Sequence, residues 1–382
     1  MKSEKHLLWV IVPFFSFLLL FLAASIVLPD YSYSPEEGRS LTQRPAILST
    51  DLHAAAESWS DYVVDQFPLR ARFLKAYSAL ELAQGKKLTR NTYIAEKEWL
   101  MTPIYRISDV QMGKLLCAVE EAEKQTESAF VYGVLPQKND MLPHLDPEYF
   151  SNTVSDDNKV RLLKGLCELG TVRVLDVGGW MLETFSAGER EQMYYKGDFH
   201  WNHLGAYWAA AYLCDSISLP ADETDFTWRQ LQVPYDGDLN RRFSYLFSRQ
   251  EEIPFYSYDH AGDLLYFDHP DAVEPVARET IVGTGLEAEK VDYNSLSTSN
   301  LGYYRVENPE KNGCILILKD SFQNPTIDYF SSVYGEIHVI DPRFYQEEWD
   351  FYELAERENF DTVLFMFHQN NASLELIDFL TK

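Results

Sequence analysis

An aspartate and two histidines stand close together in YYKGDFHWNHLGAYWAA, residues 194–210, just before a run that predicts an amphipathic helix. Asp198 and His200 are two positions apart, so in an extended loop both side chains point to one side and the carboxylate can reach the imidazole Nδ1. A histidine oriented in this way is the general base that a serine hydroxyl needs, because the hydroxyl alone is a poor nucleophile. The pair therefore indicates acyl chemistry if another part of the chain supplies the serine.

The segment CILILKDSFQNP, residues 314–325, supplies a candidate nucleophile. Its apolar residues predict a buried strand, and Ser321 follows within a polar triplet at the carboxyl end of that strand. Open α/β sheets bind their ligands at this edge. Asp198, His200 and Ser321 therefore supply the acid, base and nucleophile of a catalytic triad. Their order in the chain is no objection, since triads occur in several unrelated orders.

The same segment also offers a second chemistry. Asp198, His200 and His203 are an acid and two imidazoles close together, which is chemically adequate for a divalent metal. The H-x-x-H spacing differs from the H-E-x-x-H of helical zinc sites, and no distant fourth ligand stands out. We therefore expect no metal and no cofactor, with a metal site as the alternative.

Alternating helix and strand patterns must position these residues. Helix-then-strand units are predicted over residues 107–138 and 157–181, and the alternation resumes after residue 313, which predicts a parallel α/β sheet flanked by helices. Residues 221–312 break this pattern with aromatic-rich alternating runs between Gly, Asp and Pro turns. Such runs predict an antiparallel β-rich insertion, which could bind substrate or simply extend the sheet.

Composition narrows the class of protein. The chain has 382 residues, 46% of them hydrophobic and 14% aromatic, which indicates a globular protein with a sizeable core. Its formal net charge of -26 would repel phosphate backbones, so no nucleic-acid partner is expected. The four cysteines lie far apart without metal-ligand spacing, and we expect mostly buried free thiols at Cys117, Cys167, Cys214 and Cys314.

The amino terminus resembles a membrane span. Leu7 to Leu28 run 22 residues without a charge, and a helix of this length spans roughly 30 Å. Lys2 and Lys5 precede the run, which predicts that the rest of the chain lies outside the cell membrane. A cleaved signal peptide is the alternative, but the run is longer than a usual signal peptide core and no clear A-x-A site follows. We therefore predict a single-pass protein that contacts the lipid bilayer through an uncleaved N-terminal transmembrane helix.

These patterns divide the chain into five segments. They are a membrane anchor over 1–29, a stalk and helical region over 30–106, the first part of the α/β core over 107–220, the β-rich insertion over 221–312, and the second part of the core over 313–382.

Several short motifs resemble those of a known family. DFHW at 198–201, followed by LGAYWAA and later by KDSF and VIDPRFY, resembles the bacterial DHHW family, which is itself similar to the SGNH-hydrolase-like domains of alginate O-acetyltransferases. DQFPLRARF and NTYIAEKEWLM upstream resemble further elements of that family, so the resemblance covers nearly all of the chain after the predicted anchor. It implies a flavodoxin-like SGNH core whose triad moves acetyl groups on or off extracellular polysaccharide. By this resemblance Ser321 is the nucleophile, His200 the base and Asp198 the orienting acid.

Two positions depart from the family pattern. Phe199 stands where the family name has its first histidine, and Lys319 stands where a glycine commonly precedes the Asp-Ser pair. A lysine takes a positive φ less readily than a glycine, so the turn that carries Ser321 is where this chain could differ.

An oxyanion hole needs preorganised donors. The backbone N–H of Ser321 is the natural first donor, and Gln137, Lys138 or Asn324 could provide the second. Each of these three side chains has an ordinary alternative as a solvated loop residue.

Two further residues could contact a sugar. Trp201 suits stacking on a sugar ring, although a tryptophan at a helix start is equally often core material. Arg343 could bind sugar hydroxyls or a carboxylate, or could pair with Asp341 and stiffen its loop.

The sequence thus predicts a membrane-anchored extracytoplasmic O-acyltransferase or esterase that acts on acetyl groups of a cell-surface polysaccharide, with a membrane acyl-transfer protein as a further possible partner. Transferase and esterase share the acyl-enzyme step, so the sequence does not separate them. The alternative is a noncatalytic glycan-binding or scaffold protein of the cell surface.

Overall fold

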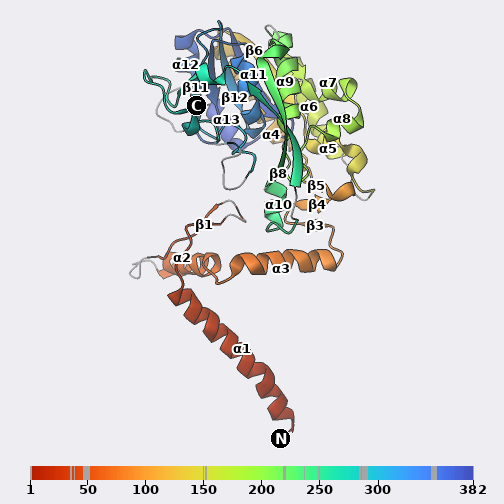
Figure 1. The fold of residues 1–382 in the computed structure, drawn as a ribbon, viewed down its shortest axis with the longest axis vertical. Helices are drawn as coiled ribbons and strands as arrows, with labels where there is room; N and C mark the ends of the chain where they lie inside the picture. Colours follow the sequence, from red (N-terminus) through yellow and green to blue (C-terminus); the bar gives the residue numbers. More distant parts are fainter. Residues whose placement is uncertain are drawn as a thin grey trace. The chain divides into compact units, whose positions relative to one another are not determined.

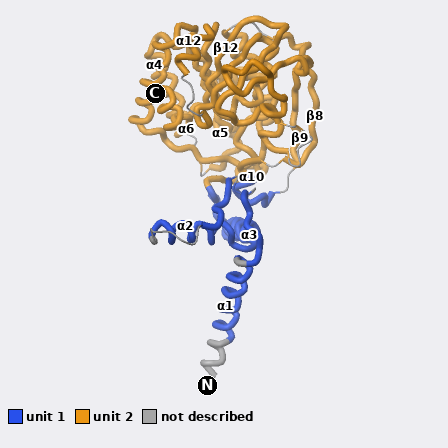
Figure 2. Tube along the Cα trace, turned by 90° about the vertical axis from the view of Figure 1, so that its left-hand side faces the viewer, with its two compact units in different colours: residues 1–90, 240–247 blue, residues 91–239, 248–382 orange. Residues whose placement is uncertain are grey.

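The computed structural model divides the chain into two compact units, residues 1–90 with 240–247 and residues 91–239 with 248–382 (Figure 2). The structure describes residues 2–34, 37, 39–45, 52–148, 150, 153–217, 221–235, 237–247, 250–283, 285, 291–345 and 351–381. The five segments predicted from the sequence stay a prediction, because the two units are defined by contacts and follow other boundaries.

The smaller unit consists mainly of helices. Its elements are α1 (Lys2–Val27), β1 (Tyr33–Ser34), β2 (Arg39–Ser40), α2 (Leu52–Asp65), α3 (Arg70–Ala83) and β3 (Leu88–Thr89). The ring of Phe21 on α1 stacks on Phe67, with centroids 5.1 Å apart, and meets Phe73 of α3 edge-on. An ion pair between Arg39 and Asp65, 2.6 Å long, ties β2 to the end of α2.

The predicted transmembrane helix is not found in the structure. The run from Leu7 to Leu28 falls largely on α1, but the side chains of residues 1–8 and of Ile26 lie outside the described ones. Across the described part of the chain, no helix is both long and apolar enough to cross a membrane.

A mostly parallel sheet forms the centre of the larger unit (Figure 1). Among the described residues its seven strands lie in the order β10 (Leu265–Phe267), β11 (Tyr303–Glu307), β13 (Glu336–Ile340), β12 (Cys314–Lys319), β14 (Thr362–His368), β6 (Ala129–Leu135) and β7 (Arg173–Asp176). The run from β13 to β7 is parallel, whereas β10 and β11 are antiparallel to their neighbours. The predicted α/β architecture with flanking helices is confirmed.

Alternate side chains of each strand enter two separate cores. Along β12, Ile315 and Ile317 belong to one core, and Leu316 and Leu318 belong to the other. Because both faces of a parallel strand are buried, its sequence is continuously apolar, as in CILIL. The first core is covered by α5 (Lys138–Met141), α7 (Val177–Thr184), α9 (His203–Ile217) and α11 (Ile327–Ser331). The second core is covered by α4 (Asp109–Gln125), α6 (Thr153–Leu169), α12 (Phe351–Glu358) and α13 (Leu374–Leu380).

Residues 221–312 contribute to two different sheets. β8 (Phe226–Pro234) and β9 (Gln250–Tyr258) form an antiparallel hairpin, while β10 and β11 extend the edge of the main sheet. The short helix α10 (Asp238–Arg242) lies between β8 and β9 in the chain, and β4 (Thr92–Ile94) pairs with β5 (Leu100–Met101).

One predicted strand is shorter than expected. Within the predicted helix-then-strand unit over 157–181, only Arg173–Asp176 is strand, because the Asp176 side chain caps α7 by accepting from Gly179 N–H.

Candidate active site

Ser321 follows β12 by two residues and begins a short 3-10 helix, Ser321–Thr326. Asp320 caps this helix, since its Oδ1 accepts a hydrogen bond of 3.0 Å from Phe322 N–H. Lys319 is the last residue of β12, so its backbone is extended and needs no positive φ. The departure from glycine at this position is therefore compatible with the turn that carries Ser321.

The three predicted catalytic residues meet at the carboxyl edge of the sheet. His200 Nδ1 lies 2.8 Å from Asp198 Oδ1, and His200 Nε2 lies 2.8 Å from Ser321 Oγ. When Nδ1–H donates to the carboxylate, Nε2 is left to accept the hydroxyl proton. Ser321, His200 and Asp198 are 8%, 4% and 1% exposed, so the nucleophile retains the most access to solvent. The arrangement has the geometry that proton transfer from serine to histidine requires.

Asp198 is held by several donors. Burial alone would raise the pKa of its carboxyl, but the adjacent His200 imidazole and the backbone N–H groups of Asp238 and His200 bring the pKa well below its ordinary value. Tyr235 places its hydroxyl 3.3 Å from Asp198 Oδ2. The acid therefore stays ionised and fixes the orientation of the imidazole.

Lys138 supports the loop that carries the acid. Its side chain is buried, and Nζ donates to the backbone oxygens of Leu100, Tyr195, Lys196 and Asp198 at 2.7 to 3.2 Å. The Lys138 side chain is thus engaged with this loop instead of being directed at an oxyanion. Gln137 lies beside it, just after β6, and stays a candidate donor.

Asn324 is also engaged within the protein. Its Oδ1 accepts from Lys319 Nζ at 2.5 Å, and its Nδ2 donates to Asn300 Oδ1 at 3.0 Å. The Lys319 ammonium further lies 3.3 Å from Asp341 Oδ2, with both side chains fully buried. These bonds leave Asn324 in a structural role, contrary to the prediction of a side-chain oxyanion donor.

Arg343 and Trp201, the two residues that could contact a sugar, instead bond to other parts of the protein. Arg343 donates to both carboxylate oxygens of Asp341, at 2.9 and 2.6 Å, and so stiffens its own loop. Trp201 is fully buried, and its indole N–H donates to Phe322 O at 2.7 Å. A buried ring cannot stack on a sugar, so the interpretation of Trp201 as a sugar platform is wrong. Trp201 instead ties the histidine loop to the serine helix.

The three residues of the metal alternative, Asp198, His200 and His203, do not form a cluster of possible ligands among the described residues. His203 Nε2 bonds to the Leu296 carbonyl oxygen at 2.9 Å, and burial lowers the pKa of His203 to about 4. In the described residues, the cluster that could surround an ion is Cys314, Glu336 and His338. Both ring nitrogens of His338 already have partners there, the Tyr303 hydroxyl and the Glu336 carboxylate, each at 2.9 Å. The imidazole of this cluster is therefore already engaged by its neighbours.

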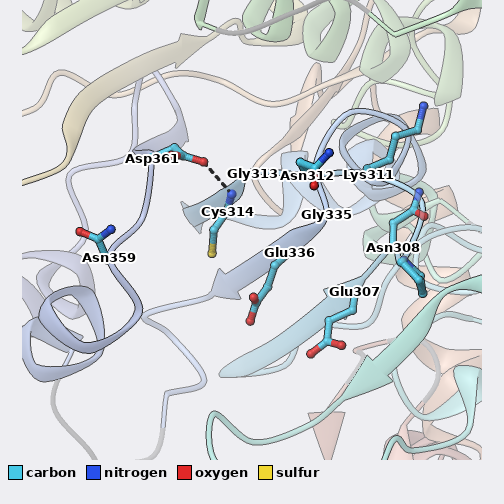
Figure 3. A pocket seen from close by; sticks show the side chains of 11 residues that line it. Glu307, Asn308, Lys311, Asn312, Gly313, Cys314, Gly335, Glu336, Asn359 and Asp361 are labelled. Atoms are coloured by element: carbon cyan, nitrogen blue, oxygen red, sulfur yellow. Dashed lines mark hydrogen bonds between the residues drawn. The ribbon is translucent and has the colours of Figure 1, made fainter.

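A pocket of about 430 Å³ lies at the opposite edge of the sheet (Figure 3). Cys314 and Glu336, the first residues of β12 and β13, contribute to its wall, whereas Ser321 follows the other end of β12. The pocket is therefore separate from the triad.

The cysteines differ from expectation: all four are free, but Cys117 and Cys167 are exposed and only Cys214 is buried.

Sequence reasoning missed two groups at the site. The first is Tyr293, whose ring stacks on His200 with centroids 3.8 Å apart. The second is His368 at the end of β14, whose Nδ1 lies 2.6 Å from Asp320 Oδ2. Both are distant in sequence from the residues that they contact. The sequence contained one signal for His368: the polar residues HQNN, 368–371, follow an apolar strand pattern.

Comparisons with known proteins show what this chain is similar to. Residues 110–261 match the family described as ALGX, SGNH hydrolase-like domain, acetyltransferase AlgX. The chain is 22% identical over 344 residues to a probable alginate O-acetylase, AlgJ, of Pseudomonas syringae pv. tomato, a match that covers 84% of this chain and 80% of that protein.

Solved structures share the fold. PatB1 of Bacillus cereus superposes with a TM-score of 0.66 at 20% identity, over 76% of this chain and 98% of that one. A DHHW family protein of Eubacterium siraeum superposes with a TM-score of 0.60 at 17% identity, over 77% of this chain and 95% of that one. The resemblance to the DHHW family and to the SGNH-like domains of alginate O-acetyltransferases is thus confirmed.

Proposed function

We propose that this protein is an SGNH-like O-acetyltransferase that acts on a polysaccharide through Ser321, His200 and Asp198. The observation that carries the proposal is the unbroken chain of contacts from Asp198 Oδ1 through His200 to Ser321 Oγ, at 2.8 Å each. Among similar proteins, AlgJ is described as a probable alginate O-acetylase and the matched family as an acetyltransferase domain. Both descriptions support acetyl transfer, and the first names alginate, which supports a sugar hydroxyl as the acceptor.

The geometry supports a two-step reaction. Ser321 Oγ attacks the acyl carbonyl carbon while His200 Nε2 takes the hydroxyl proton, and the leaving alcohol departs with that proton as the acyl-enzyme forms. A sugar hydroxyl then attacks the acyl-enzyme, gives its proton to Nε2, and leaves as the acetyl ester when the proton returns to Ser321. Water in place of the sugar would make the protein an esterase.

A serine-directed sulfonyl fluoride tests the nucleophile. PatB1 has been solved with a sulfonyl adduct, which makes this reagent class suitable. Wild-type protein should gain one sulfonyl group on Ser321, located by peptide mass spectrometry, and lose turnover of a chromogenic acetyl ester. The Ser321→Ala protein should not be labelled, whereas Ser186→Ala, which removes an N-cap serine of α8 (Ala187–Glu191), should behave as wild type. Equal turnover in Ser321→Ala and wild type would contradict the proposal.

The same assay addresses the metal and scaffold alternatives. Turnover should survive a strong chelator, because no step of the proposed reaction uses a metal. A folded wild-type protein that binds a polysaccharide, resists the sulfonyl reagent and turns over no ester would favour the noncatalytic glycan-binding scaffold. Acetyl transfer to a sugar oligomer, compared with release of free acetate, separates transferase from esterase.

The location of the protein is also a proposal, and it rests on the sequence. The uncharged run Leu7–Leu28 after Lys2 and Lys5 favours attachment to the cell membrane with the catalytic unit outside. There the unit would meet polysaccharide, and a membrane protein would have to deliver the acyl group. Protease added to intact cells should digest the unit, and a soluble product lacking the first 25 to 30 or so residues would instead indicate cleavage.

A further inference from the structure

Tyr293 contacts both the base and the nucleophile segment of the triad. Its ring lies flat on the His200 imidazole, with centroids 3.8 Å apart and planes 6° apart. Its hydroxyl donates to the Ser321 carbonyl oxygen at 2.7 Å, and the Phe322 carbonyl oxygen lies 3.5 Å away. One side chain, 6% exposed, thus spans the two elements whose relative position sets the distance from Nε2 to Oγ.

The segment around Tyr293 is itself held in place. Ser297 Oγ donates to the Tyr293 carbonyl oxygen at 2.6 Å, and the preceding Asp292 exchanges bonds with Ser295. Val291 forms a bridge with Tyr235, the residue whose hydroxyl approaches Asp198. The Tyr293 ring is therefore fixed before substrate arrives, which is the condition for preorganised catalysis.

A stacked aromatic face interacts differently with the two charge states of histidine. The face of a tyrosine ring carries negative potential and attracts a cation. His200 is neutral before reaction and becomes an imidazolium when it takes the serine proton, so the attraction grows as the transition state forms. An interaction stronger in the transition state than in the ground state raises kcat without requiring tighter substrate binding.

The other groups around the imidazole do not replace this contact. Phe199 and Phe322 approach at tilted angles of 32° and 54°, with centroids 4.0 and 5.0 Å away. Asp198 meets the imidazole edge at Nδ1 and supports the cation in the ring plane. Among these rings only Tyr293 is parallel to the imidazole.

We infer that Tyr293 is a positioning residue of the triad: its ring holds and stabilises the His200 imidazolium, and its hydroxyl fixes the Ser321 turn. This inference rests on the proposed function of Ser321 and His200. It also gives residues 221–312 a role in completing the catalytic site, in addition to extending the sheet.

Two substitutions separate the two parts of the inference. Tyr293→Phe keeps the ring and removes the hydroxyl, and Tyr293→Leu removes both. We expect kcat for a chromogenic acetyl ester to fall in the order wild type, Phe, Leu, with KM changed by less than about twofold. The ring contact alone should account for roughly 3- to 30-fold in kcat, the range of a desolvated cation–π interaction.

Tyr256 provides a matched control. It is a buried tyrosine whose hydroxyl donates to the Pro325 carbonyl oxygen at 2.7 Å, so it bonds to the same 3-10 helix four residues after Ser321. Tyr256→Phe should lower the thermal unfolding midpoint about as much as Tyr293→Phe and leave kcat near wild type. Equal kcat values for the two Phe variants would overturn the role of the Tyr293 hydroxyl.

A double-mutant cycle tests the role of the ring. In a His200→Ala background, Tyr293→Leu and Tyr293→Phe should have equal residual turnover, because both lack the hydroxyl and the ring acts through the imidazole. The same difference in turnover between these two variants in both backgrounds, or full kcat in the single Tyr293→Leu variant, would overturn the inference. If Tyr293→Leu fails to fold, Tyr293→Trp replaces it: this variant keeps an aromatic face and should retain more kcat than a folded Tyr293→Met. If Ser321→Ala keeps wild-type turnover, the proposed function fails, and that outcome is distinct from any result at Tyr293.

Discussion

Two aspartate–histidine pairs flank Ser321, and only one of them contacts it. In the first pair, His200 Nδ1 lies 2.8 Å from Asp198; in the second, His368 Nδ1 lies 2.6 Å from Asp320. The Phe322 ring contacts both imidazoles, stacked on His368 and tilted against His200. The bond between acid and imidazole is thus nearly the same in the two pairs.

The difference lies in the second contact of the imidazole, which for His200 is the nucleophile. His200 is almost fully buried and directs Nε2 at Ser321 Oγ, whereas the His368 side chain is 25% exposed. Asp320 also accepts from the backbone N–H groups of Phe322 and His368 and from Asn371 Nδ2, so it binds the serine turn to the end of β14. An acid beside a histidine therefore does not identify a base; the direction of the free ring nitrogen does.

Removal of each imidazole should give the largest difference in kcat between the two pairs. His200→Ala should lower kcat for an acetyl ester by roughly 10⁵- to 10⁶-fold, because the serine loses its base. His368→Ala should lower it by less than about tenfold, since the reaction has no proton transfer for this ring to perform. Steady-state kinetics on protein with an unchanged circular dichroism spectrum would measure both. Similar losses in the two variants would mean that His368 takes part in proton transfer.

The two acids should separate activity from stability. Asp198→Asn should cost roughly 10⁴-fold in kcat, because an amide no longer selects the required imidazole tautomer. Asp320→Asn should instead lower the thermal unfolding midpoint more than Asp198→Asn does and keep most activity per folded molecule, since Asp320 joins two segments of backbone. Kinetics and thermal denaturation of both variants would show whether one loses activity and the other loses stability. A larger activity loss in Asp320→Asn would place that acid in the reaction.

Sequence reasoning found one pair and missed the other for a physical reason. Asp198 and His200 are neighbours in the chain, so alternation along an extended segment was enough to bring them together. Asp320 and His368 are brought together by the pairing of β12 with β14, and Tyr293 reaches His200 from an irregular segment. Contacts of this kind depend on strand order, which periodicity does not determine.

The fold was predictable for the same local reason, and the substrate residues were not. Apolar strands such as CILIL and the alternation with helices predicted the sheet, because burial on both faces leaves a continuous apolar pattern. The burial of Trp201 and the engagement of Lys138 and Asn324 follow from neighbours far away in the sequence. The side chains predicted to meet substrate or oxyanion were therefore assigned less reliably than the triad.

Asp140 is a third acid at the same edge of the sheet and follows β6. Its carboxylate accepts hydrogen bonds from two neutral groups, Ser155 and Gln369, and so shows how an acid behaves here with neutral partners. Burial raises the pKa of Asp140 to about 7, whereas the imidazole partners keep the pKa values of Asp198 and Asp320 below the ordinary range. Between about pH 4 and pH 7, folded protein therefore holds a proton on Asp140 that the unfolded chain releases.

Stability should consequently fall as pH rises through this window, by up to about 4 kcal/mol from Asp140, and level off above pH 7. The two paired acids contribute little slope there, since above about pH 5 they are ionised in both the folded and unfolded states. Asp140→Asn should remove the Asp140 contribution, so the difference in unfolding midpoint between variant and wild type should grow from pH 5 to pH 7.5 in favour of the variant. His203, whose lowered pKa gives a slope of opposite sign, is present in both proteins and cancels in the difference. Parallel pH profiles for the two proteins would show that Asp140 is ionised in the fold, and that an imidazole is not what distinguishes the paired acids from it.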